Sequence, residues 1–208
     1  MRTVRRAGDG GLLVETSGLD DSHRLHRALR DAAFAGVTDI VPGERTVLVV
    51  AEPDGCDLDR LAARVAAVEP GEADAEDAPP VEIPVRYDGE DLAEVAELTG
   101  LSVREVVERH AAAEYSVAYL GFSPGFGYLT GLDEKLHVPR RASPRTSVPA
   151  GSVAIAGPYA AVYPSPSPGG WRLLGHTDLT MWDVHRDPPS LLRPGLKVRF
   201  VFERERER

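Results

Sequence analysis

Three pieces of the sequence, GFSPGFGYL (121–129), PRRASPRTSVPAGSVAIAGP (139–158) and VYPSPSPGGWRLLGHT (162–177), decide how the second half of the chain is built. Residues 121–177 hold eight of the 17 prolines and nine of the 20 glycines. Because proline fixes φ and glycine permits unusual φ values, such a stretch is typical of ordered loops between short strands. It also carries five basic and two acidic side chains in a chain of net charge -9. The stretch therefore predicts a loop surface for an anionic ligand.

Residues 81–208 as a whole predict a mainly β domain. Short apolar runs such as SVAIAG (152–157) and LKVRFVF (196–202) are separated by turn residues, which favours a barrel or a sandwich. Two helical patterns, at 90–100 and 102–113, precede these runs. Ser102 and Glu105 have the spacing of a capping box at the start of the second helix.

Residues 1–80 predict an α+β domain. Strand-like runs alternate with two one-sided helical patterns, at 22–36 and 57–68, and we expect a small ferredoxin-like sheet covered on one face. Ser22 is the expected N-cap of the first helix and Gly36 its stop. The segment EPGEADAEDAPP (69–80) has five acids and no base, which predicts a linker between the two domains.

Composition excludes several classes of protein. No apolar run approaches the roughly 18 residues that span a bilayer, and no signal-peptide core follows the first residues, so we expect a cytoplasmic protein without a membrane partner. The acidic balance argues against nucleic-acid binding, which depends on clustered basic side chains. The single cysteine, Cys56, excludes an internal disulfide, and the six histidines predict no metal site.

Gly121, Ser123 and Gly125 match the G-x-S-x-G pattern of a serine hydrolase. In that motif the residue after the serine donates its backbone N–H to the oxyanion and opens a helix. Here that residue is Pro124, which has no N–H. The pattern therefore argues against an acyl nucleophile at Ser123.

Anion binding has several candidates, although no Walker A phosphate loop is present. Glycines 125, 127, 169 and 170 can present backbone N–H groups to an anion, and Arg140 and Arg145 can add guanidinium contacts. The alternative is that the glycines form tight turns and the arginines pair with acids.

Histidines and aromatic residues complete the candidate set. His176 lies where the glycine-rich loop rejoins the strands and is a candidate general acid or base, whereas His110 is expected to be a cation at a helix C-terminus. Aromatic residues around the loops supply the wall of a small-ligand pocket. They are Phe122, Phe126, Tyr128, Tyr163 and Trp171.

The motifs at 121–129, 139–157 and 163–177 resemble those of the family of 5-oxoprolinase B subunits, whose members are also labelled allophanate hydrolase subunit 1 or Kip-type histidine kinase inhibitors. The resemblance covers essentially the whole chain and implies an α+β domain followed by a cyclophilin-like β-barrel. It implies a larger partner, the C subunit, and together with the A subunit an ATP-dependent hydrolysis of 5-oxoproline to glutamate. The chain alone would be inactive, and ATP, with magnesium, would bind in the assembled complex.

Candidate site residues follow from these motifs. We predict catalytic roles for Arg145 and His176, because opening an unreactive lactam through phosphoryl transfer needs placed cations and a proton carrier. The predicted ligand contacts are Ser123, Gly125, Phe126, Tyr128, Arg140, Ser152, Tyr163, Gly169, Gly170, Trp171 and Thr177. His176 stands where the family has an arginine, Gly127 where it usually has proline, and Ala160-Ala161 where it has a Thr-Gly pair, so the substrate is left open.

Two other functions remain open at this point. The chain can be a regulatory protein that binds a sensor histidine kinase, or a component of an allophanate hydrolase or urea amidolyase. It lacks the Ser-Ser-Lys signature of an amidase, which ranks the second alternative last. Prolyl isomerase activity is not expected from a barrel resemblance alone.

Overall fold

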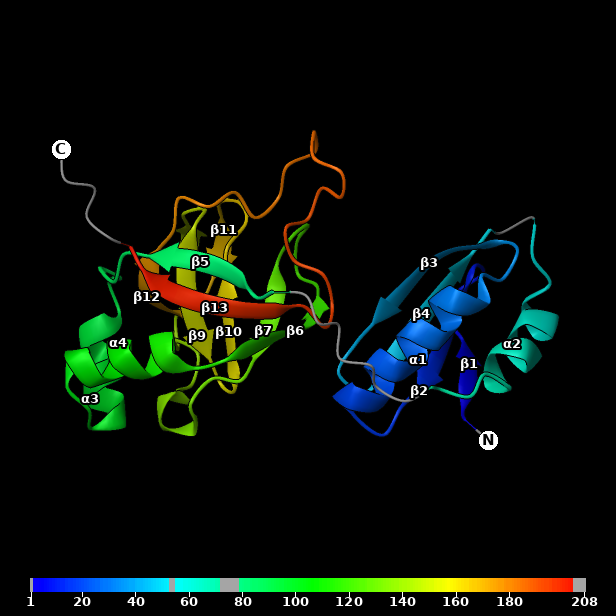
Figure 1. Ribbon diagram of the computed structural model, residues 1–208, viewed down its shortest axis with the longest axis horizontal. Helices are drawn as coiled ribbons and strands as arrows, with labels where there is room; N and C mark the ends of the chain where they lie inside the picture. Colours follow the sequence, from blue (N-terminus) through cyan, green and yellow to red (C-terminus); the bar gives the residue numbers. More distant parts are fainter. Residues whose placement is uncertain (1, 53–54, 72–78, 204–208) are drawn as a thin grey trace. The chain divides into compact units, whose positions relative to one another are not determined.

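The computed structural model describes residues 2–52, 55–71 and 79–203 and divides the chain into two compact units, residues 1–76 and 77–208 (Figure 1). Each unit has its own hydrophobic core. Most of the predicted acidic linker, 69–80, lies outside the described residues. Among the helices of the described residues, none combines the length and the apolar character needed to cross a membrane.

The first unit is a four-stranded antiparallel sheet with two helices on one face. Strand order is β1-β2-β4-β3, and both α1 and the strands contribute to a core that includes Leu25, Val47 and Val49. The elements are β1 (Val4–Arg6), β2 (Gly11–Glu15), α1 (Leu19–Ala32), β3 (Val37–Pro42), β4 (Thr46–Ala51) and α2 (Leu58–Ala66).

The ferredoxin-like topology predicted for this unit is not confirmed. Strand β4 pairs with both β2 and β3, as in a split β–α–β unit, but the strand beside β2 is β1, which precedes it in the chain rather than following α2. The predicted cap was also wrong: Ser22 lies inside α1 and its hydroxyl donates to the Thr46 carbonyl. The helix ends at Ala33, in a left-handed conformation, before Gly36.

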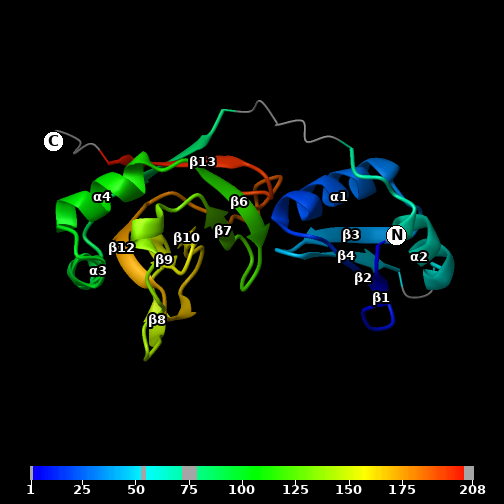
Figure 2. The same cartoon turned by 90° about the horizontal axis from the view of Figure 1, so that it is seen from below.

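The second unit is mainly β and its central sheet is nearly closed into a barrel (Figure 2). Seven strands follow the order β12-β9-β10-β7-β6-β13-β5, and β5 meets β12 through a bridge between Arg86 and His176. The strands are β5 (Val81–Val85), β6 (Tyr115–Leu120), β7 (Gly127–Thr130), β9 (Ser152–Ala156), β10 (Tyr159–Val162), β12 (Arg172–His176) and β13 (Lys197–Phe202).

Two helices pack on this sheet: α3 (Leu92–Thr99) on β12 and α4 (Val103–Ala112) on β13. The predicted capping box is confirmed, with Ser102 Oγ accepting from the Glu105 N–H and Glu105 accepting from the Ser102 N–H. A short 3-10 helix, η1 (Glu134–Leu136), lies near both helices.

A two-stranded ribbon, β8 (Arg145–Val148) with β11 (Ser167–Gly169), covers part of the outer wall of the barrel. Strand β9 is buried on both faces for this reason. Its Val153 and Ile155 join the barrel core, and Ala154 and Ala156 join a second apolar cluster with Val148 of the ribbon. The wall and the ribbon together place the motifs of 121–177 in one region.

Candidate functional site

The chain reverses between β6 and β7 through a tight turn at residues 121–126. Ser123 N–H donates to the Gly121 carbonyl at 2.7 Å, a γ-turn that holds Phe122 at φ 66. Residues other than glycine rarely adopt this left-handed backbone conformation. Phe122 is also 63% exposed to solvent.

A second reversal follows at once. Phe126 N–H donates to the Ser123 carbonyl at 3.0 Å, with Pro124 at the position where its fixed φ fits and Gly125 at φ 79. The next element is strand β7 rather than a helix, so the serine-hydrolase arrangement is absent here. Ser123 Oγ is buried and has no hydrogen-bond partner among the described residues.

The predicted aromatic contacts mostly form a packed layer between the barrel wall and the ribbon. Phe126, Tyr163 and Trp171 are buried, with the Phe126 ring 5.3 Å from Tyr163 and 5.6 Å from Trp171 in edge-to-face geometry. Tyr128 packs on the same layer and remains half-buried. Three of these rings are therefore core residues of the fold, and Phe122 is the exposed member of the set.

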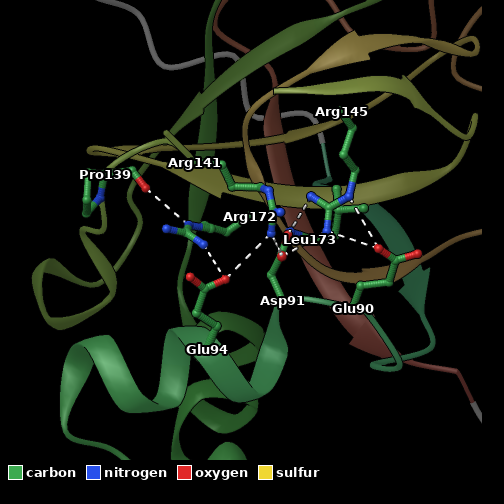
Figure 3. A network of polar contacts seen from close by, with 8 residues as sticks. All are labelled: Glu90, Asp91, Glu94, Pro139, Arg141, Arg145, Arg172 and Leu173. Carbon is green, nitrogen blue, oxygen red and sulfur yellow. Dashed lines mark hydrogen bonds and ion pairs between the residues drawn. The ribbon is translucent and has the colours of Figure 1, made fainter. Parts of the chain in front are cut away.

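Two arginines of the region, Arg141 and Arg145, converge on one buried carboxylate, Asp91, just before α3 (Figure 3). Asp91 is 2% exposed and accepts from Arg141 Nη1 at 2.6 Å, from Arg145 Nη1 and Nη2 at 2.9 and 2.8 Å, and from the Leu173 N–H at 2.8 Å. Burial acts to raise the pKa of Asp91, but the hydrogen bonds from Arg145 and Leu173 outweigh it and the pKa lies below its ordinary value.

Two more carboxylates complete this arginine network. Glu90 accepts from Arg145 Nη2 at 3.0 Å, and Glu94 pairs with Arg172, whose Nε donates to the Pro139 carbonyl at 3.3 Å. Three arginines thus face three carboxylates within the network. Arg145, predicted as a catalytic cation, is only 17% exposed and joins the ribbon to the start of α3.

Arg140 is placed differently from its neighbour Arg141. It is exposed, its guanidinium carbon lies 5.8 Å from the centre of the Trp171 ring, and within the described parts of the chain no carboxylate pairs with it. A hydrogen bond of 2.8 Å from the Arg141 N–H to the Gly170 carbonyl holds this segment against the glycine-rich loop. The structure therefore brings together Arg140, Gly170 and Trp171, three of the residues predicted to contact a ligand.

His176 lies at the end of β12, at the closure of the barrel. Its Nδ1 is 2.8 Å from Asp88 Oδ1, and its backbone exchanges two hydrogen bonds of 2.9 Å with Arg86. Such a carboxylate contact fixes the ring and leaves Nε2 for a proton transfer. Thr177 and Ser152 are buried beside it in the backbone pairing of β9 and β12, which assigns them to the wall.

The glycines of the loop allow close backbone approach. A methyl group on Gly169 would overlap the Tyr163 hydroxyl, whereas one on Gly170 would have its nearest neighbour at 3.6 Å. Gly127 lies where a methyl would meet Leu192 at 2.8 Å, and Gly125 where it would meet Trp182 at 2.8 Å. The described residues contain no group of three or more His, Cys, Asp or Glu side chains placed to hold a metal ion.

His110 is buried inside the barrel unit, so the expected helix-terminal cation was wrong. Its Nδ1 is 2.9 Å from the Tyr87 hydroxyl, and its ring packs against Tyr115 and Phe200. Burial lowers the pKa of His110 to about 3, and the ring is neutral at pH 7.

Sequence reasoning missed Asp88, Glu90 and Asp91, although they form the acidic half of the site. The signal is the segment DGED (88–91), in which Gly89 lets the backbone approach the Leu173 and Leu174 carbonyls of β12. Its partners lie about 50 or more residues away along the chain, at Arg141, Arg145 and His176. Local patterns show a helix start there and nothing of these partners.

Comparison with known protein families identifies the family of this chain. Residues 2–192 match the carboxyltransferase domain, subdomain C and D. The chain belongs to this family. A relative from Escherichia coli O157:H7, named as the B subunit of 5-oxoprolinase, is 49% identical over 186 residues, which are 88% of this chain and 84% of the relative. The resemblance to the 5-oxoprolinase B subunits is thereby confirmed.

Solved structures agree with this assignment. The crystal structure of TTHA0988 matches with a TM-score of 0.83 and 39% identity over 97% of this chain, yet this chain spans 41% of that one. The urea amidolyase of K. lactis matches with a TM-score of 0.77 at 22% identity over 99% of this chain and 15% of that chain, a likeness of fold.

Proposed function

We propose that this chain is the B subunit of an ATP-dependent 5-oxoprolinase, which hydrolyses 5-oxoproline to glutamate together with a larger C subunit and with an A subunit. The observation that carries the proposal is the 49% identity to the E. coli protein named as the B subunit of 5-oxoprolinase, extending over 88% of this chain. The proposal includes the cyclophilin-like character of the barrel and a cytoplasmic location, where ATP is available.

The arginine network supports a non-autonomous subunit. A nucleotide site needs cations or backbone donors left over for phosphates, usually with metal ligands. Arg141, Arg145 and Arg172 already face Glu90, Asp91 and Glu94. These three candidate cations are therefore occupied, and among the described arginines of this region Arg140 alone remains without a carboxylate partner. We assign ATP and its magnesium ion to the assembled complex.

Arg140 is the residue best placed to meet the carboxylate of 5-oxoproline. It is exposed, has no carboxylate partner among the described residues, and is steadied by the Trp171 ring. Guanidinium groups bind carboxylates through paired hydrogen bonds.

His176 is proposed as a proton carrier at the end of β12, a place separate from the Arg140–Trp171 contact that precedes the strand. Asp88 holds its Nδ1 side, so that Nε2 is the atom available to a ligand. Arg145 is assigned to support of the ribbon rather than to contact with substrate, because its donors already meet Glu90 and Asp91.

Co-expression with candidate A and C subunits tests the proposal. The purified assembly should hydrolyse ATP in response to 5-oxoproline, and the chain alone should not. An assembly verified to contain all three chains that shows no stimulated hydrolysis would contradict the proposal and would favour the regulatory alternative.

A further inference from the structure

The turn at Phe122 carries two costs that the fold itself does not require. A non-glycine residue in the left-handed region is strained. The same residue exposes 63% of an aromatic side chain to solvent. Both costs fall on one residue of a turn whose backbone hydrogen bonds, from Ser123 to Gly121 and from Gly121 to Phe126, involve no side chain.

The ring of Phe122 is nevertheless held firmly. It packs edge-to-face on Phe126 at 5.3 Å, and Phe126 is buried in the aromatic layer with Tyr163 and Trp171. Pro124 and Gly125 fix the returning half of the turn. Phe122 is therefore an exposed ring whose orientation is restricted by its contact with Phe126 and by the turn. A partner that covers the ring would cost it little further side-chain entropy.

We propose that Phe122 is an anchor through which this chain docks onto its larger partner in the enzyme complex. A small ligand needs a concave site that encloses most of its surface, whereas a projecting ring fits a pocket on another protein. Aromatic residues are also the type most enriched among the residues that dominate protein interfaces. The inference rests on the proposed function, since it names the surface by which this chain joins its complex.

The length of a solved relative indicates which protein covers Phe122. TTHA0988 matches 97% of this chain, but that match covers 41% of TTHA0988, so the relative joins further polypeptide to the same fold in one chain. In a protein that is a separate subunit, the counterpart of that further polypeptide is a second chain, which must be bound non-covalently. The occupant of the Phe122 surface is then the larger subunit, which presents an apolar pocket for a phenyl ring.

The test uses calorimetry to measure the dissociation constant between this chain and the purified larger subunit. Phe122→Ala should weaken binding at least about 30-fold, as expected for a central interface residue, and Phe122→Gly should do the same. Leu98→Ala is the matched control, because Leu98 is a 50% exposed apolar residue on α3 and its loss should leave binding unchanged.

The melting temperature of the isolated variants separates docking from folding. Glycine is free to adopt the left-handed conformation, so Phe122→Gly should melt at or above the temperature of the unmodified chain. Unfolding of this variant, or binding by Phe122→Ala equal to that of the unmodified chain, would overturn the inference. If the unmodified chain fails to bind the larger subunit, both the proposed function and this inference fail. If the unmodified chain binds and Phe122→Ala binds equally well, this inference fails and the proposed function stands.

Discussion

Asp91 and Arg145 lie 54 residues apart in the sequence and are joined by two hydrogen bonds of 2.8 and 2.9 Å, which tie the start of α3 to the β8–β11 ribbon through a buried carboxylate. Arg141 adds a third contact to Asp91 at 2.6 Å. Arg141 and Arg145, two of the basic residues expected near an anionic ligand, are thus paired with a carboxylate and hold the ribbon against the barrel. Arg140, beside Trp171 before β12, and the His176–Asp88 pair, at the end of β12, remain as the candidate ligand groups.

Asp91→Asn should destabilise the barrel unit by about 3 kcal/mol, because removing one partner of a buried pair leaves charged groups uncompensated. Urea denaturation followed by tryptophan fluorescence measures this unit specifically, since both tryptophans, Trp171 and Trp182, belong to it. Glu90→Gln is the control: Glu90 is 76% exposed, and its loss should cost less than about 1 kcal/mol. Equal stability of the two variants would refute a central role for Asp91.

Arg140→Ala should raise the KM of the assembled enzyme for 5-oxoproline by roughly tenfold or more, since a charge-assisted hydrogen bond is worth about 1.5–3 kcal/mol. Its melting temperature should stay unchanged, as Arg140 has no carboxylate partner among the described residues. Arg145→Ala should behave in the opposite way and lower the melting temperature of the isolated chain. A variant of Arg140 with an unaltered KM would exclude it as the substrate cation.

His110 should make the barrel unit sensitive to acid. Its pKa is about 3 in the folded chain, against about 6.5 when unfolded, so below about pH 6.5 the unfolded chain binds a proton that the native chain refuses. The free energy of unfolding should then fall by up to about 1.4 kcal/mol per pH unit between about pH 6 and pH 4.

His110→Gln removes this titration and should flatten the decline, measured again by tryptophan fluorescence. This probe is needed because burial also lowers the pKa of His26, to about 4, in the first unit, where no tryptophan lies. If the variant and the unmodified chain lose stability with the same slope, His110 does not titrate as described.

Gly169→Ala should destabilise the chain by about 1–3 kcal/mol, because the added methyl overlaps the Tyr163 hydroxyl inside a packed layer. Gly170→Ala is the matched variant one residue away, with its nearest neighbour at 3.6 Å, and should be tolerated. Thermal melting of the pair checks the packing of the ribbon on the barrel. A tolerated Gly169→Ala would mean that this packing is loose.

Features with local causes could be predicted from the sequence. The capping box of Ser102 and Glu105 is formed within one helical turn, and the rigid turn around Pro124 follows from proline and glycine geometry. Ser22 failed as a cap because its hydroxyl finds a partner in β4, at Thr46, which local spacing does not show. The barrel-like sheet follows from the alternation of short strands and turns, whereas its closure at Arg86 and His176 does not.

In the candidate site, too, some features have local causes and others depend on contacts between distant parts of the chain. Basic and aromatic residues were recognisable from their motifs, but their roles depend on contacts across about 50 or more residues. His110 illustrates the difference: its place at the end of a helical pattern predicts a cation, and the rings of Tyr115 and Phe200 around it keep it neutral. Burial decides the charge state, and burial comes from tertiary packing.

The role of this chain in 5-oxoproline hydrolysis is tested most directly by the glutamate that its two partners form from 5-oxoproline and ATP, with and without this chain. Glutamate is expected only when all three chains are present, in step with the phosphate released from ATP. Glutamate formed at the same rate by the two partners alone, or no glutamate from a verified three-chain assembly, would contradict the proposed role.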